Sequence, residues 1–164
     1  MKFRLKPSSR AQHPNVDIAV SDLIRPLDRL RKTFNRHDLD GLATSFHQRA
    51  VLVAPDGVGQ DRDEIASYYG VFMEAFPDSM CTPKAVTTSG DTVVAEYTLT
   101  GTHKGLYLAP GGELVEPTGR PITVRACSVS IVEDGVIVNH RIFYDQLEVI
   151  SQIGGSPRFG AGEE

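Results

Sequence analysis

The 164-residue sequence contains no tryptophan and only two cysteines, Cys81 and Cys127, which lie far apart. No CxxC pair or Cys/His cluster occurs, so we expect no zinc or other metal site, and no cofactor is implied. Two isolated thiols are typical of a reducing compartment, although one disulfide between them remains an alternative. The N-terminus lacks an apolar run of signal-peptide length. We therefore expect a cytoplasmic protein.

The sequence also lacks long hydrophobic runs and an excess of basic charge. No window approaches the length of about 18 apolar residues that a membrane span needs. Lys and Arg number 17 against 21 Asp and Glu, which gives a formal net charge of −4. A chain without an overall positive field cannot hold phosphate backbones well, so neither a nucleic acid nor a membrane is an expected partner.

The length and the apolar fraction of 40% are those of one globular domain. Turn-forming residues near the start predict an irregular N-terminal arm over 1–20. The Gly-rich end of the chain predicts a disordered tail over 155–164. The domain itself is expected over 21–154.

Apolar residues recur at helical spacing in three segments of the first half. Leu23, Leu27, Leu30 and Phe34 predict a first helix. Asp38 is a plausible N-cap for a short second one. The capping-box pattern 61–64 begins a third helix, which Pro77 ends. The apolar stripe of this third helix is Ile65, Tyr68, Tyr69, Phe72, Met73 and Phe76.

The second half is typical of β-strands joined by turns. After a short strand at 50–54, turn signals at Ser89-Gly90-Asp91 and Glu133-Asp134-Gly135 each separate two strand-like segments. Hairpins join antiparallel strands, so we expect an antiparallel sheet. A short helix follows Asp145. Helices first and strands afterwards predict an α+β fold, a cone in which a curved sheet packs against three N-terminal helices.

The last hairpin predicts which side chains share a face of the sheet. In its simplest register Val129 opposes His140, and a more apolar face carrying Arg125, Cys127, His140 and Tyr144 turns inward. Tyr97 is expected to point inward from the preceding long strand. A β-bulge would exchange the faces locally. Burying unpaired cationic groups in an apolar wall is costly, so Arg125 and His140 should line a wet cavity or its rim.

Several segments resemble the NTF2-like superfamily, and within it the SnoaL-like polyketide cyclase (ester cyclase) branch. The segments are Asn35–Leu42, Gln60–Tyr69, Leu99–Gly105, Pro117–Arg120, Tyr144–Gln146 and Ile153–Gly154. The resemblance implies a cone-shaped α+β barrel, often dimeric. It also implies a deep apolar pocket for a polyketide- or steroid-like ligand.

The same resemblance implies positions for catalytic groups, and this sequence departs from them. Cyclases of the branch use an Asp on the last strand, assisted by a His on the strand before. Here those positions hold Ile142 and Ser128. The catalytic Asp of ketosteroid isomerase corresponds to Ala54 in this sequence. The acid of limonene epoxide hydrolase corresponds to Cys127. The scaffold is therefore implied, while each of these three chemistries lacks its carboxylates.

The residues themselves suggest a different set of candidates. His140 is the candidate general acid/base because its free pKa lies near neutrality, and a hydrogen-bonded wall histidine is the alternative. Arg125 is a candidate for binding a ligand oxygen, or else for an ion pair with a helix acid. The ligand-binding wall is expected to include Tyr97, Cys127, Tyr144, Phe72 and Phe76. Asp145 is interpreted as a helix cap, and His103 as a surface or rim group.

The sequence thus predicts a protein whose pocket holds a small, apolar, oxygenated ligand. As an enzyme it would act as an isomerase, cyclase or dehydratase on a polyketide- or steroid-like carbonyl compound. The alternatives are a non-catalytic binding or carrier protein and a dimerising interaction domain. A homodimer is expected to form through the sheet, with Ser128, Ser130, Asn139 and Arg141 in a wet interface.

Overall fold

A computed structural model describes residues 20–110 and 112–156. The helices are α1 (Val20–Asn35), α2 (Leu39–Ala43), α3 (Arg62–Ala75) and α4 (Gln146–Gln152). The strands are β1 (Phe46–Ala54), β2 (Gly57–Gly59), β3 (Met80–Ser89), β4 (Thr92–Thr102), β5 (Tyr107–Leu108), β6 (Leu114–Val115), β7 (Pro121–Glu133) and β8 (Val136–Tyr144). The predicted N-terminal arm and C-terminal tail lie almost wholly outside the described residues.

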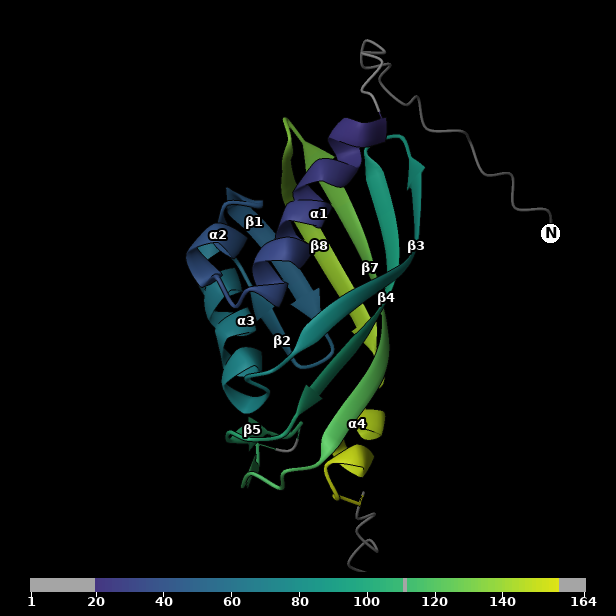
Figure 1. Ribbon diagram of the computed structural model, residues 1–164. Coiled ribbons are helices and arrows are strands. Elements are labelled where there is room, and N and C mark those ends of the chain that lie inside the picture. Colours follow the sequence, from purple (N-terminus) through teal and green to yellow (C-terminus); the bar gives the residue numbers. More distant parts are fainter. Residues whose placement is uncertain (1–19, 111, 157–164) are drawn as a thin grey trace, which may run out of the picture.

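Six strands form one curved sheet in the order β2-β1-β8-β7-β4-β3. The three N-terminal helices lie along one face of this sheet, and α4 lies at its lower end (Figure 1). Strands β5 and β6 form a separate two-stranded ribbon within the loop before β7. This arrangement confirms the predicted α+β fold. Among the described residues, no helix is both long enough and apolar enough to cross a membrane.

Side-chain caps fix where the helices begin. The Asp61 carboxylate accepts hydrogen bonds from the backbone N–H groups of Asp63 and Glu64, at 2.9 and 2.8 Å. Glu64 in turn accepts from the Gln60 N–H at 2.8 Å, which completes the predicted capping box. Asp145 caps α4 through the Leu147 N–H at 2.9 Å. The interpretation of Asp145 as a cap is confirmed.

The expectation of a wholly antiparallel sheet is wrong at one pairing. Strand β1 runs parallel to β8, with Leu52 opposite His140. A parallel neighbour requires a long crossover rather than a hairpin, and α3 with the strands that follow it supplies that connection. Strand β1 also begins at Phe46, before the start of the strand predicted at 50–54.

A β-bulge near the end of the β7–β8 hairpin decides which face of β7 is buried. Ile131 pairs with Asn139 and Val132 with Ile137, so that Val138 has no partner. Beyond the bulge the simple register is shifted by one residue, and His140 lies opposite Ser130 instead of Val129. The predicted inward face of β7 is therefore wrong. The buried side chains of β7 beyond the bulge are Ile122, Val124, Ala126, Ser128 and Ser130.

The core of the domain has two parts. The larger lies between α1, α3 and the concave sheet and includes the fully buried Leu42, Phe46 and Leu52. The smaller lies between the end of α3, β7 and α4 and includes Phe76 and Ile153. Burial of each such side chain contributes about 1.5–3 kcal/mol to the stability of the fold, so both parts of the core stabilise the cone.

His103 belongs to the smaller core and not to the surface, which corrects the sequence expectation. Its side chain is completely buried, and its ring packs against Phe76 with 5.5 Å between centroids. The Thr118 N–H donates to its Nδ1 at 3.3 Å. The next turn is held beneath α3, because the Gly105 N–H donates to the Ala75 carbonyl at 3.1 Å. His103 therefore fastens the β4–β7 loop to the body of the domain.

Candidate functional site

A mostly apolar cavity of about 320 Å³ lies between α1, α3 and the concave face of the sheet. Its wall includes Leu27 and Phe34 from α1, Phe72 from α3 and Leu99 from β4. A cavity of this size lined in this way suits a small ring compound. The polar groups that reach it are few, so each one restricts what the site can do.

The sheet presents its inward side chains to the cavity in rows that cross β4, β7 and β8. His140 lies in one row with Ser130. The next row holds Ser128 and Ile142. The row after that joins Tyr97, Ala126 and Tyr144. Successive rows are about 7 Å apart, because each is two residues further along a strand.

His140 lines the cavity at the first of these rows and is only 2% exposed. Its Nδ1 lies 2.8 Å from the Ser130 hydroxyl. Its ring meets Phe46 edge-on, with 5.7 Å between centroids. Burial lowers the pKa of His140 to about 4. The imidazole is therefore neutral at physiological pH, and it can accept a proton but holds no extra one to give.

Two tyrosines belong to the cavity wall. Tyr69 from α3 and Tyr97 from β4 both line the cavity. Burial raises the pKa of Tyr69 well above its usual value, and the nearby Tyr97 raises it further. Burial likewise raises the pKa of Tyr97. Both phenols therefore stay protonated and can donate hydrogen bonds to a ligand oxygen.

A second polar cluster lies where the β1–β2 turn meets α3 and β8, and the sequence did not predict it. The Tyr68 hydroxyl donates to Asp56 at 2.7 Å. Burial, followed by the negative charge of Asp56, raises the pKa of both Tyr68 and Tyr144. Asp56 sits in a Pro-Asp-Gly turn and Tyr68 in an apolar helical stripe. Only the packing of α3 against β1 brings them together.

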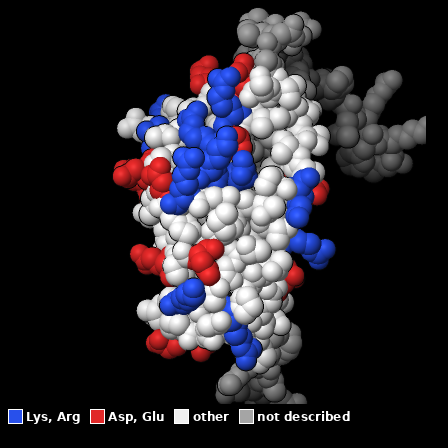
Figure 2. Space-filling model, viewed as in Figure 1, with Lys and Arg blue, Asp and Glu red and all other residues white. Residues whose placement is uncertain are grey.

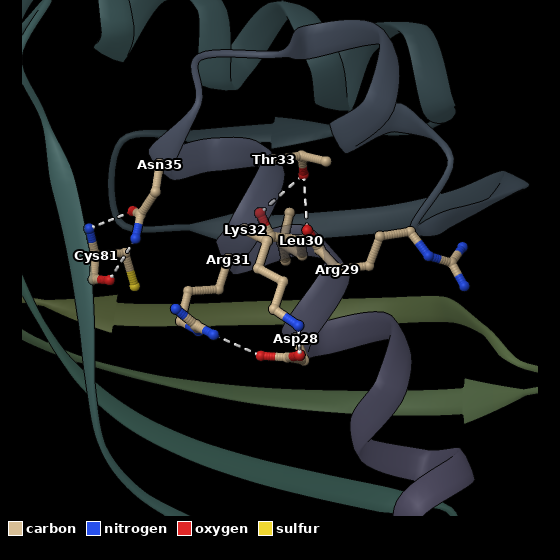
Figure 3. A network of polar contacts seen from close by, with 8 residues as sticks. All are labelled: Asp28, Arg29, Leu30, Arg31, Lys32, Thr33, Asn35 and Cys81. Atoms are coloured by element: carbon tan, nitrogen blue, oxygen red, sulfur yellow. Dashed lines mark hydrogen bonds and ion pairs between the residues drawn. The ribbon is translucent and has the colours of Figure 1, made fainter.

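A guanidinium does reach the cavity, but it belongs to Arg31 on α1 rather than to Arg125. Arg31 and Asp28 both line the cavity, and they form an ion pair at 2.6 Å. Lys32 approaches the same carboxylate at 2.6 Å (Figure 3). The only sequence signal was the spacing of Asp28 and Arg31, one turn apart. That spacing is typical of a solvent-exposed helix face and does not by itself indicate a site.

The bulge removes two predicted wall residues from the cavity. Arg125 is exposed on the outer face of the sheet, and Cys127 is half-buried beside it. Both line a separate, shallow hollow there, with Glu96 and Phe143. Their predicted place in the inner wall is wrong. The extra residue in β8 shifts the β7–β8 pairing by one, so the opposite set of β7 side chains faces the core.

The remaining wall predictions concern three aromatic residues and the two positions where the family resemblance implied catalytic groups. Tyr144 and Phe72 line the cavity, as Tyr97 does. Phe76 does not reach it but packs behind Phe72 at 4.9 Å between centroids. Ile142 and Ser128 both face the cavity. The chain therefore presents a sec-butyl group and a hydroxyl at the positions where an acid and an imidazole were implied.

The thiols and the acidic groups form no further centre among the residues described. Cys81 lines the cavity and Cys127 the outer hollow, and both are free. Burial raises the pKa of Cys81 to about 11, against the opposing effect of Arg31. Within residues 20–110 and 112–156, His, Cys, Asp and Glu form no group of three that could hold a metal ion.

Comparisons with known proteins agree with this geometry. The sequence profile of the SnoaL-like domain family matches residues 27–140. IdmH from Streptomyces antibioticus, a proposed polyketide cyclase, is 28% identical and superposes with a TM-score of 0.69 over 80% of this chain and 98% of its own. A proposed SnoaL-like polyketide cyclase from Jannaschia sp. is 22% identical, with a TM-score of 0.74 over 86% of this chain and 99% of its own.

An NTF2-like protein from Burkholderia pseudomallei shares the fold as well. It is 20% identical and has a TM-score of 0.68 over 83% of this chain and all (100%) of its own. A comparison with curated proteins gave no match. The fold is therefore NTF2-like, whereas the activity has to be argued from the cavity.

Proposed function

We propose that this chain, which belongs to the SnoaL-like domain family, catalyses acid/base chemistry on a polyketide- or steroid-like carbonyl compound. The reaction would be an isomerisation, a cyclisation or a dehydration. The observation that carries this proposal is the neutral, fixed imidazole of His140 in the wall of an apolar cavity that also holds two protonated phenols. Such chemistry needs a base, hydrogen-bond donors and an apolar environment.

The roles follow from the atoms that each group offers. In this mechanism Nδ1 of His140 carries the ring hydrogen and donates it to the Ser130 hydroxyl. Nε2 is then the unprotonated nitrogen that takes a proton from the carbon next to the ligand carbonyl. The electron pair of that C–H bond then moves onto the carbonyl oxygen. Tyr69 and Tyr97 would donate hydrogen bonds to this oxygen and stabilise its negative charge. The imidazolium returns its proton to a different carbon, or to a departing hydroxyl group.

Proton abstraction can be tested before the natural substrate is known. The protein is incubated in D₂O with 2-tetralone, 1-tetralone and 5-androstene-3,17-dione, and deuterium entering next to each carbonyl is followed by mass spectrometry. We expect enzyme-dependent exchange with at least one ketone, reduced about 100-fold or more in His140→Gln. Glutamine is similar in size and keeps a polar contact with Ser130, but it cannot act as a base. Equal exchange by wild type and variant would remove His140 from the mechanism.

A binding or carrier protein is the second candidate, and one observation favours it. Ile142 and Ser128 face the cavity where the resemblance implied a carboxylate and an imidazole. A pocket that had lost both groups could retain its ligand without converting it. Saturable binding of these ketones with no exchange above the buffer rate would support this alternative and contradict the catalytic one.

We also propose a homodimer formed through the outer face of the sheet. Phe143 is 52% exposed and Val53 is 42% exposed, and both point away from the cavity. On the same outer face, half-buried Cys127 pairs with Phe143 and half-buried Val129 pairs with Arg141. A two-fold axis would place the same apolar patch of each copy against the other.

This interface is drier than the sequence suggested. Ser128 and Ser130 are buried on the inner face, so they cannot belong to it, while Asn139 and Arg141 remain on the outer side. A reducing compartment such as the cytoplasm is the setting that we propose, since both thiols are free.

A further inference from the structure

The cavity opens to solvent between α1 and β3. Among its lining residues, Arg31 and Asp28 on α1 keep 30% and 38% of their side-chain surface exposed. Val86 on β3 is 43% exposed. A ligand entering here passes the guanidinium before it reaches the aromatic interior. On the α1 side of this opening the ionised groups are those of one short helical segment. Glu96 of β4 also lines the cavity, but it pairs with Cys127 at a strand position of the outer face.

Charge on the α1 side of the opening is not balanced. Asp28 is shared by two cations, Arg31 and Lys32, each 2.6 Å away. Side-chain hydrogen bonds from Lys32 and Arg31 hold the pKa of the Asp28 carboxyl below its usual value, so it stays ionised. The three groups together carry one positive charge in excess. Figure 3 shows both cations converging on Asp28 from the same helix, with Cys81 on the facing strand.

Helix α1 as a whole has the same sign, because its four cations outnumber Asp22 and Asp28. Helix α1 carries Arg25 and Arg29 besides Arg31 and Lys32, and Arg36 follows it. Figure 2 shows a group of blue side chains over the region that α1 covers in Figure 1. This basic concentration is local, because the whole chain has a net charge of −4. A positive field around an opening attracts anions and raises their rate of entry.

We infer that the natural ligand is an acid, an apolar ring compound with a carboxylate or similar anionic group that Arg31 binds at this opening. The inference rests on the proposed function, since it takes the cavity as the ligand site, and it adds the chemical class of the ligand. The ring body lies among the aromatic side chains and its carbonyl reaches Tyr69 and Tyr97. The anionic group remains at the α1 edge, where the planar guanidinium of Arg31 can donate two parallel hydrogen bonds to a carboxylate.

Binding of such a ligand requires Arg31 to exchange partners. The pair with Asp28 is at the surface, and surface pairs of this kind contribute little to stability. Lys32 remains beside Asp28 when the guanidinium turns to the ligand, so the carboxylate keeps a cation. Asp28 therefore competes with the ligand for Arg31 without blocking it.

The test compares anthracene-2-carboxylic acid with anthracene-2-carboxamide, which have the same ring body and differ in charge. Their fluorescence is titrated with wild type and three variants. We expect wild type to bind the acid about tenfold more tightly than the amide. Arg31→Gln should abolish this preference and leave the affinity for the amide within about threefold of wild type.

Two further variants separate a local role from a general charge effect. Arg25→Gln removes an equal charge from the same helix, and Arg25 pairs with Asp22 at the same one-turn spacing without lining the cavity. This control should keep the preference for the acid. Asp28→Asn removes the competing carboxylate and should strengthen binding of the acid several-fold, a gain that misfolding cannot produce.

The outcomes distinguish this inference from the function on which it rests. Equal affinity of wild type for acid and amide, or equal loss in Arg31→Gln and Arg25→Gln, overturns the acid class and leaves the cavity as a ligand site. Failure of both compounds to bind overturns the ligand site and the inference together. A preference for the acid that Arg31→Gln alone abolishes supports both.

Discussion

The Ser130 hydroxyl lies 2.8 Å from Nδ1 of His140, across the β7–β8 pairing. No other hydrogen bond to this ring is formed among the described residues. Ser130 is itself completely buried, so the contact is shielded from water. A neutral hydroxyl can orient the imidazole but cannot stabilise its charged form as a carboxylate would. The pair therefore keeps a base in place without raising its pKa.

Stability should fall with acidity because of this residue. The pKa of His140 is about 4 in the folded protein against 6.5 for a free histidine, so between these values the unfolded chain binds more protons. Its contribution is therefore complete above pH 6.5 and is lost as the pH falls toward 4, by about 3 kcal/mol in all. Urea unfolding at several pH values measures this loss.

The comparison with His140→Gln isolates the histidine in that experiment. Any loss of packing in the variant lowers its stability equally at every pH, whereas its free energy of unfolding should vary about 3 kcal/mol less across this window. Contributions from other titrating groups, including His103 with its lowered pKa, remain in both proteins. Parallel curves for wild type and variant would contradict the burial-lowered pKa.

The loop held by His103 should be sensitive to a single methyl group. A Cβ at Gly105 would collide with the backbone carbonyl of Glu74 in α3, which cannot move aside without shifting the helix. We expect Gly105→Ala to lose about 1–3 kcal/mol of stability, seen as a drop of several degrees in the thermal midpoint.

Gly70→Ala is the matched control for that substitution. Gly70 is inside α3, and a Cβ there would meet only the end of the Leu39 side chain at 3.3 Å. Alanine favours the helix by about 1 kcal/mol over glycine, so this variant should be as stable as wild type or slightly more so. Equal destabilisation by both substitutions would argue against the tight approach at Gly105.

The proposed dimer predicts that one outer-face substitution separates the copies. Phe143→Glu places a charge on the patch twice, once in each protomer, and should weaken self-association about 100-fold or more. Sedimentation equilibrium measures this change. Leu147→Glu serves as a control, since Leu147 is also an exposed apolar residue, at 57%, but it lies on α4 and not on the sheet.

The rate at which Cys127 is alkylated provides an independent test of the same interface. This residue is half-buried on the outer face, so its alkylation by iodoacetamide should speed up when Phe143→Glu separates the copies. A wild-type protein that sediments as a monomer throughout the concentration range would contradict the proposed dimer.

The sequence predicted the parts of this molecule that local rules determine. Caps such as Asp61 and Asp145 act on backbone groups two or three residues away, so a short pattern is enough to identify them. The stripe of α3 likewise depends only on helical periodicity. These local signals, with the family resemblance, were enough for the fold.

The site depended on longer-range features, and these were harder to predict. The bulge at Val138 is a single unpaired residue in an otherwise regular hairpin, with no glycine or proline to mark it. It removed Arg125 from the wall and left His140 in place. Arg31 and Asp56 were missed because each lies in a segment with an ordinary local role, a charged helix face and a tight turn. Their contribution to the cavity arises only from how the segments pack.

The parallel contact of β1 with β8 has a consequence for how the chain matures. The first long strand cannot pair with its inner neighbour β8 until the segments between them have been synthesised. Until then the apolar side of β1 has no partner on that edge, and the nascent chain is open to misassociation. Contacts between such distant segments also slow folding. Loss of the C-terminal strand by early termination would therefore leave no closed cone, rather than a slightly smaller one.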